Sequence, residues 1–301
     1  MTHLYISPET TLHCGPLAVT LAPAAGGRIT RLVSGTVDWL VPLADAVRQT
    51  GFESTAWPKA GCYPLVPFSN RIRHGALAWA GRQAQLPIHP GEHHALHGGS
   101  QQMPWTLTQQ DTSSASMAYV HERGQHGWPW SFSAEQTVRL APQALTLQLR
   151  VTNTDTAEMP CGMGFHPYFP ARFAHRVGFK AQTVWAPDAE FLGTPPAAVP
   201  ATDNYATPRT LADAELTQYY GAWDGEAELN SADGPTIQIK ADAALRHLVL
   251  HRPAGRGYFC VESVSHVSNA VPLQARHAGT GWLALQPGAS AQCRMTLQLA
   301  G

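Results

Sequence analysis

The sequence predicts an all-β fold, a large antiparallel β-sandwich. Hydrophobic residues recur with a period of two in several segments, and no long segment has a convincing helical period. The 26 glycines and 24 prolines are spaced as expected for many short strands joined by turns. All-β folds of about this length often form one domain, and no linker or fixed repeat interrupts the chain. We therefore expect a single domain over residues 1–301.

The clearest strand is predicted over residues 145–152, where leucine or valine alternates with threonine, glutamine or arginine. Residues 287–290 (Pro-Gly-Ala-Ser) predict a turn before the last strand, and residues 194–211, rich in alanine, proline and threonine, predict a long surface loop. Other strands with the same alternation are expected at residues 132–140, 236–239, 248–250 and 295–299.

Composition excludes several classes of partner. The formal net charge of −1, with charges spread along the chain, predicts no nucleic acid and no anionic membrane as partner. The N-terminus lacks a secretory pattern, and no run of about eighteen apolar residues occurs. Five widely spaced cysteines without a C-x-x-C pair predict buried, reduced thiols. We expect a cytoplasmic protein that acts on a neutral small molecule.

A rigid segment precedes the first candidate site residues. Two prolines and an Asn-Arg pair stand between apolar residues in residues 63–73, so Asn70 and Arg71 should be held firmly. The planar fork of Arg71 could then bind hydroxyls or a ring oxygen in a cleft. The alternative is a structural arginine that pairs with backbone carbonyls. Arg73, one strand period later, would share the same face.

Three histidines and a glutamate at residues 92–97 resemble a metal site at first sight. On a strand, however, His93 and His97 would face the side opposite to His94, and no cysteine nearby completes a coordination sphere. We therefore predict no metal and no other cofactor. Gly98 and Gly99, which allow a ligand to approach the backbone closely, single out His97 as a site residue.

His166 lies in a Gly-Phe-His-Pro-Tyr-Phe segment. Pro167 favours an extended backbone at His166, and the neighbouring aromatic residues would fix and partly desolvate the imidazole. Aromatic faces also suit the C–H faces of a pyranose, so the segment could hold a sugar and supply a proton near neutral pH. A core histidine satisfied by the backbone is the alternative.

Glu262 ends an otherwise apolar strand and shares a face with Tyr258 and Cys260. Burial beside aromatic residues would raise the pKa of this carboxyl group into the range of a general base. The alternative is a salt bridge at the rim with Arg252 or Arg256. Together Arg71, His97, His166 and Glu262 form a set suited to proton transfer on a polyhydroxylated ligand.

In this order the segments resemble the aldose 1-epimerases, or galactose mutarotases. The likeness runs from the Pro-Ala-Ala-Gly-Gly-Arg-Ile stretch at residues 23–29 through residues 61–72, Leu96-His97-Gly98 and His166-Pro167-Tyr168-Phe169 to the turn at Pro287. The sequence of residues 262–270 is most similar to the bacterial branch of this family. The likeness covers nearly the whole chain.

The resemblance implies a twisted, galactose mutarotase-like supersandwich that interconverts the α and β anomers of a monosaccharide without a metal. By this likeness Glu262 is the general base, His166 protonates the ring oxygen, His97 supports the ring oxygen or nearby hydroxyls, and Arg71 with Asn70 orients the sugar. Such roles require a carboxylate and an imidazolium near pH 7, and they predict a bell-shaped pH profile.

Two positions depart from the family pattern. Thr217 and Gln218 stand where an acidic residue of the family commonly holds sugar hydroxyls, so the sequence does not determine which sugar is preferred. The nearby Asp224-Gly225 predicts a hairpin turn. Ser263 stands where a proline often follows the catalytic glutamate. Two alternatives remain: a hexose-6-phosphate epimerase that binds phosphate through Arg73, Arg252 and Arg256, and a non-catalytic carbohydrate-binding or sensing protein.

Overall fold

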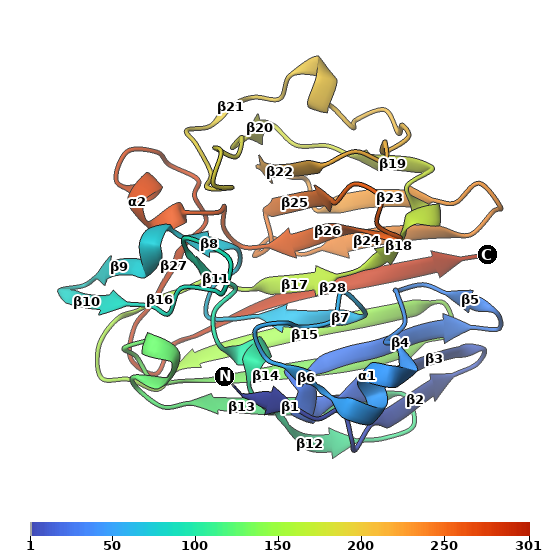
Figure 1. Cartoon of the computed structure of the whole chain (residues 1–301), viewed down its shortest axis with the longest axis horizontal. Coiled ribbons are helices and arrows are strands. Elements are labelled where there is room, and N and C mark those ends of the chain that lie inside the picture. The colour runs from blue at the N-terminus through green and yellow to red at the C-terminus, as the bar shows by residue number, and fades with distance from the viewer. Residues whose placement is uncertain (1) are drawn as a thin grey trace.

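A computed structural model of the chain describes residues 2–301 and contains two large antiparallel sheets (Figure 1). The prediction of an all-β antiparallel sandwich is confirmed. The larger sheet has twelve strands and the smaller has eight, and short loops with glycine at positive φ join many of them. The expectation that residues 1–301 form one domain stays a prediction.

The larger sheet begins with N-terminal strands and continues with strands from the second half of the chain. The main order is β2 (Thr10–Cys14), β3 (Leu17–Ala22), β4 (Arg28–Ser34), β7 (Cys62–Leu65), β17 (Gly164–Pro167), β26 (Tyr258–Val264), β25 (His247–Arg252), β22 (Leu216–Gly221), β20 (Thr183–Val184) and β21 (Ala197–Ala198). Two further short strands join this sheet: β18 (Phe169–Pro170) pairs with β26, and β5 (Val37–Asp38) pairs with β4.

The smaller sheet contains the long strands with the cleanest alternation. Its order is β12 (Thr106–Gln110), β13 (Ser114–His121), β14 (Phe132–Ala141), β15 (Ala144–Asn153), β28 (Ser290–Ala300), β24 (Thr236–Ala241), β23 (Glu226–Asn230) and β19 (Arg176–Phe179). Each strand predicted from the alternation lies within one of these strands or within β25.

Short elements accompany the two large sheets. Four two-stranded sheets pair β1 (His3–Leu4) with β6 (Phe52–Glu53), β8 (Arg71–Ile72) with β11 (Ala95–Leu96), β9 (Ala76–Trp79) with β10 (Arg82–Gln85), and β16 (Met159–Cys161) with β27 (Leu283–Leu285). The α-helices of the described residues are α1 (Asp45–Thr50) and α2 (Ala270–Gln274). Single 3₁₀ turns occur at Pro23–Ala25, Arg73–Gly75, Ser100–Gln102, Gln125–Gly127, Ala171–Phe173 and Ala201–Asp203.

The main core lies between the two sheets. Leu145, Leu147 and Leu149 on β15 are fully buried, and they belong to the same apolar cluster as Val19 and Leu21 on β3. β14 packs directly against β2 and β3. One face of each long strand is therefore removed from water, which is the origin of the period of two in the sequence.

The larger sheet is buried on both faces. Val261 on β26 belongs to the core between the sheets, whereas its neighbour Cys260 belongs to a second cluster on the outer face. Phe165 on β17 points into the first core, so His166 points to the outer side. Apolar residues on both faces explain why β25 and β26 lack the hydrophobic–polar alternation of the smaller sheet.

Two local expectations are corrected. The Asp224-Gly225 turn does not close a hairpin, because β22 before it belongs to the larger sheet and β23 after it belongs to the smaller one. Glu262 lies inside β26 rather than at its end, since the strand continues to Val264.

The long loop predicted at residues 194–211 is confirmed, and it contains one short strand, β21.

Four of the five cysteines are buried and Cys14 is half-buried, and all five are free thiols, as the spacing predicted. In the described part of the chain, no helix combines the length and the apolar character that crossing a bilayer requires.

The junction before β7 gives a first prediction. A Cβ at Gly61, where φ is +66°, would meet the backbone oxygen of Ile29 at 1.7 Å. Because a backbone atom must move, Gly61→Ala should lower the free energy of unfolding by at least about 3 kcal/mol. Gly35 also has a positive φ but has nothing within 4 Å of such a Cβ, so Gly35→Ala should cost only about 1 kcal/mol. Urea unfolding measures both; equal losses would contradict the packing argument.

Candidate active site

A cleft with a cavity volume of about 260 Å³ lies over the outer face of the larger sheet. Its lining includes all five sequence-predicted site residues: Asn70, Arg71, His97, His166 and Glu262. These residues come from segments far apart in the sequence, and the fold brings them to one place. A cavity of this size suits a monosaccharide-sized ligand.

The register of the sheet places the central residues in one row. His166 on β17 is paired with Tyr63 on β7, and Glu262 on β26 is paired with Val249 on β25, which is paired with Tyr219 on β22. Between β17 and β26, Gly164 pairs with Val264 and Phe165 with Ser263, so His166 and Glu262 occupy the next positions of the same register. Residues in one row project to the same face.

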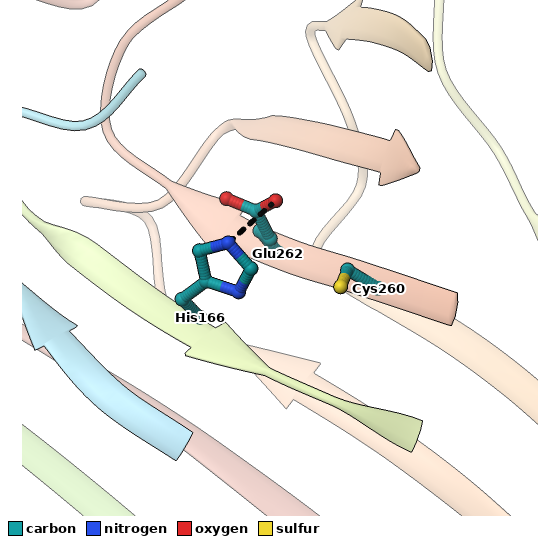
Figure 2. Close-up of side chains that lie close together, drawn as sticks. All are labelled: His166, Cys260 and Glu262. Atoms are coloured by element: carbon teal, nitrogen blue, oxygen red, sulfur yellow. Dashed lines mark ion pairs between the residues drawn. The ribbon is translucent and has the colours of Figure 1, made fainter. Parts of the chain in front are cut away.

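His166 and Glu262 form the buried acid–base pair of the cleft. The Nε2 atom of His166 lies 3.5 Å from Oε1 of Glu262, and both side chains are almost completely buried (Figure 2). The other polar atoms, Nδ1 of His166 and Oε2 of Glu262, have no hydrogen-bond partner among the described residues. These two atoms are buried, so no other protein group uses the hydrogen-bonding capacity of the pair.

Aromatic rings fix the imidazole of His166. Its ring stacks on Tyr168 at a centroid distance of 4.7 Å and lies 4.8 Å from the ring of Tyr63. The ring of His97 meets it edge-on at 5.1 Å. The prediction of an extended, desolvated histidine is confirmed, although Tyr63 comes from a neighbouring strand rather than from the adjacent sequence.

His97 and Asn70 hold each other through the backbone. The N–H of Asn70 donates to Nδ1 of His97 at 3.0 Å, and the N–H of His97 donates to the carbonyl of Asn70 at 2.9 Å. Because Nδ1 accepts, a neutral His97 carries its proton on Nε2. Both residues have positive φ, 55° for Asn70 and 60° for His97, and this exchange holds them there.

Arg71 is fixed by an acid rather than by backbone carbonyls. Its Nε and Nη2 donate to the two carboxylate oxygens of Glu92 at 2.8 and 2.6 Å, and the guanidinium lies 5.0 Å from the ring centre of Phe191. This bidentate contact leaves Nη1 of Arg71 available to a ligand.

Burial dominates the titration of the central pair. Desolvation raises the pKa of Glu262 to about 8, against the opposing charge of Arg71. Desolvation, and then the charge of His97, hold the pKa of His166 well below 6.5. The expectation that burial raises the pKa of Glu262 is confirmed. The carboxylate and imidazolium that the family roles require are not the favoured forms, because burial favours the neutral form of each group. Near pH 7 the pair therefore holds one titratable proton, on Glu262.

Several sequence expectations about neighbouring residues are corrected. Gly98 and Gly99 do not open the backbone to this cleft, because a Cβ would meet Pro67 at the first and His126 at the second. Arg73 pairs with Asp188, and Arg252 with Asp213; neither of these arginines, nor Arg256, lines the cleft.

The two residues at the position of the expected acid point in different directions. Thr217 lines the cleft, and its hydroxyl lies 2.9 Å from Nδ1 of His251. Gln218 points away and donates to Asp203. This side of the cleft is therefore neutral.

The Glu92–His97 segment does not gather a metal site. Glu92 binds Arg71, His93 is exposed and contacts Glu190, and His97 lies in the cleft. In residues 2–301, one group of donors has the spacing of a metal site: His166, Cys260 and Glu262, within 4.8 Å of one another (Figure 2). Burial raises the pKa of the Cys260 thiol, which opposes the thiolate form that binds zinc.

Sequence reasoning missed part of the lining, notably Trp57, Lys59, Phe191 and His251. Trp57 donates from Nε1 to the hydroxyl of Tyr168 at 3.1 Å. The Trp-Pro-Lys sequence just before the rigid segment was an available signal, because it combines an aromatic residue, a fixed backbone and a cation. The position of Phe191 depends on its φ of +61°, which the sequence does not reveal.

Known proteins resemble this chain over most of its length. The sequence pattern of the family described as aldose 1-epimerase matches residues 22–298. The uncharacterized protein YphB of Escherichia coli (strain K12) is 29% identical over 259 residues, which cover 83% of this chain and 87% of YphB.

Solved structures share the fold. A galactose mutarotase-like protein from Clostridium acetobutylicum superposes with a TM-score of 0.86 at 18% identity, over 97% of this chain and 95% of that one. The GalM/aldose epimerase homologue from C. elegans has a TM-score of 0.81 at 16% identity, over 97% and 99% of the two chains.

The raised pKa of Glu262 predicts a pH-dependent stability. As pH rises from 4.5 to about 8, the unfolded chain loses this proton before the folded one, so the folded state loses stability. At about 1.4 kcal/mol per pKa unit the loss amounts to several kcal/mol. Glu262→Gln removes the titrating group and should therefore remove this loss. The stability of the variant relative to wild type should increase as the pH rises from 5 to 9.

Urea unfolding of wild type and Glu262→Gln at pH 5 and at pH 9 measures the difference between their free energies of unfolding. Glu215→Gln is the control, because Glu215 is exposed and does not line the cleft. A constant difference between wild type and Glu262→Gln over this range would contradict the buried titration.

Proposed function

The chain belongs to the aldose 1-epimerase family, and from this premise we propose that it is an isomerase that interconverts the α and β anomers of a free hexose. The observation that carries the proposal is the buried pair of His166 and Glu262 on the floor of one cleft, 3.5 Å apart and open to a ligand. Anomer exchange needs a proton acceptor at the C1 hydroxyl and a proton donor at the ring oxygen.

The proposed reaction begins with ring opening. Glu262 takes the proton of the C1 hydroxyl while His166 gives a proton to the ring oxygen; the C1–O bond to the ring oxygen breaks and the aldehyde forms. Rotation about C1–C2 presents the other face of the carbonyl. In the closing step the ring hydroxyl returns its proton to His166 as it attacks C1, and Glu262 protonates the new C1 oxygen.

A single proton on the pair is sufficient for this cycle. The neutral pair and the carboxylate–imidazolium pair differ only in which partner holds that proton, and 3.5 Å separates the two atoms. Burial favours the neutral pair, so we propose that hydroxyl contacts of the bound sugar shift the proton to His166. Each turnover then restores the starting state without exchange with solvent.

The remaining predicted residues position the sugar. The Nε2–H of His97 is directed to the ring oxygen or an adjacent hydroxyl, since its Nδ1 is occupied by Asn70. Nη1 of Arg71 binds a further hydroxyl, since Glu92 occupies its other donors. Their fixed geometry lowers the entropic cost of orienting the substrate.

The alternatives have weaker support. The three arginines suggested for a hexose 6-phosphate lie outside the cleft, so they do not favour that substrate. A binding or sensing protein would not need a buried acid–base pair, whose desolvation carries a cost in stability.

The proposal predicts that Glu262→Gln lowers kcat/KM by about 10²–10⁴, because general acid–base catalysis contributes this range. Polarimetry with freshly dissolved α-glucose or α-galactose measures the approach to anomeric equilibrium against buffer alone. Glu215→Gln should retain wild-type activity. If wild type and Glu262→Gln both match the buffer rate, the protein is not an epimerase for these sugars.

The shared proton predicts a bell-shaped profile of kcat/KM. Activity should fall above about pH 8, where the pair loses its proton, and again well below pH 6.5, where it binds a second one. The profile is measured with one hexose in overlapping buffers after subtraction of each buffer rate. A profile that is flat from pH 5 to 9 would rule out this pair as the acid and base.

A further inference from the structure

Lys59 is a cation of the cleft that the proposed reaction does not use. It lines the same cavity as His166 and Glu262, and its Nζ lies 4.3 Å from the centre of the Trp57 ring. Trp57 is itself fixed, because its Nε1 donates to Tyr168 and its ring meets His97 edge-on at 5.9 Å. Lys59 is an exposed residue, and its contact with the fixed Trp57 ring holds the ammonium group at the cleft.

The buried Arg28 fixes the backbone on both sides of Lys59. Arg28 is fully buried, and its Nη1 donates to the carbonyls of Pro58 and Ala60, at 3.4 and 3.0 Å, on either side of Lys59. Two further donors of Arg28, Nε and Nη2, have no partner among the described residues. A buried guanidinium is costly, and here it fixes the wall of the cleft from which Lys59 extends.

No acidic side chain in residues 2–301 forms an ion pair with Lys59. Two carboxylates line the cleft: Glu92, which Arg71 holds in a bidentate contact, and Glu262, which pairs with His166. Glu215, whose charge acts on His251, lies outside the lining and accepts a hydrogen bond from the N–H of Ala254.

The charges of the cleft lining therefore do not cancel. Arg71 and Glu92 neutralise each other, and His166 and Glu262 share one proton, so that pair is neutral as a whole. Burial keeps His97 and His251 uncharged by lowering the pKa of each. One positive charge is left near pH 7, on Lys59, because desolvation lowers its pKa only to about 8. Its field reaches the acid–base pair, since it contributes to the lowered pKa of His166.

We infer that the preferred substrate is an aldose with an anionic substituent, such as a carboxylate or a phosphate, and that Lys59 binds this group. This inference rests on the proposed acid–base reaction and replaces the neutral free hexose with an anionic derivative as the preferred substrate. The C1 hydroxyl and the ring oxygen must contact Glu262 and His166, so the anionic group is carried by another carbon of the sugar. An anion at Lys59 neutralises the remaining charge of the cleft.

The test compares each neutral hexose with its anionic counterparts. Anomer exchange is measured by polarimetry or NMR for galactose, galacturonate and galactose 6-phosphate, and for the glucose series, after subtraction of the uncatalysed rate. At low salt, kcat/KM for at least one anionic form should exceed that of the neutral sugar about tenfold. The ratio should fall with added salt. A preference for the uronate assigns a carboxylate, and a preference for the phosphate ester assigns a phosphate.

Variants connect this preference to Lys59. Lys59→Met should abolish the ratio of anionic to neutral kcat/KM, whereas Lys59→Arg should keep most of it. Lys240→Met is the matched control, because Lys240 is an exposed lysine on β24 outside the cleft. An unchanged ratio in Lys59→Met, or a wild type that prefers the neutral sugars, would overturn the inference while leaving the epimerase function intact.

A binding measurement keeps the inference separate from the function. If no sugar is converted faster than in buffer, the proposed function fails, and calorimetric titration with galactose and galacturonate still tests Lys59. The inference is supported if wild type binds galacturonate more tightly than galactose and Lys59→Met does not. Equal affinity for the two sugars would overturn it.

Discussion

The functional geometry depends on one constraint, the register between β17 and β26 on the outer face of the larger sheet. That register places His166 opposite Glu262, with Tyr63 on one side of the row and Val249 and Tyr219 on the other. A slip of either strand by one residue would turn its site residue into the sandwich core. Phe165 and Val261, the sequence neighbours of His166 and Glu262, are buried in that core and oppose such a slip.

The same burial that fixes the pair also sets its chemistry. A carboxyl group and an imidazole removed from water both favour their neutral forms, so the two groups share one proton. Glu262 thereby becomes a stronger base when it ionises, and His166 a stronger acid when it is protonated. The pair gains reactivity and loses some folding stability, a trade-off common at catalytic sites.

Charge compensation divides the cleft into two parts. Arg71 is neutralised by Glu92 and can orient a ligand without attracting it strongly, whereas Lys59 on the opposite anchored segment keeps its charge. Arg28 beneath that segment is also uncompensated by any carboxylate, because its contacts are two carbonyls and the ring of Tyr63 at 4.5 Å. The lining of the cleft thus contains one cation that is paired, Arg71, and one that is not, Lys59.

The sequence by itself determined the fold class and five of the residues that meet in the cleft, namely Asn70, Arg71, His97, His166 and Glu262. The period of two at Leu145–Leu149 reports burial on one face, and the prolines and flanking aromatic residues mark the rigid segments that carry Arg71 and His166. Only the tertiary structure decided the protonation of the pair, the acid that holds Arg71 and the free charge of Lys59. These properties arise from desolvation and from contacts between distant strands, which no local pattern encodes.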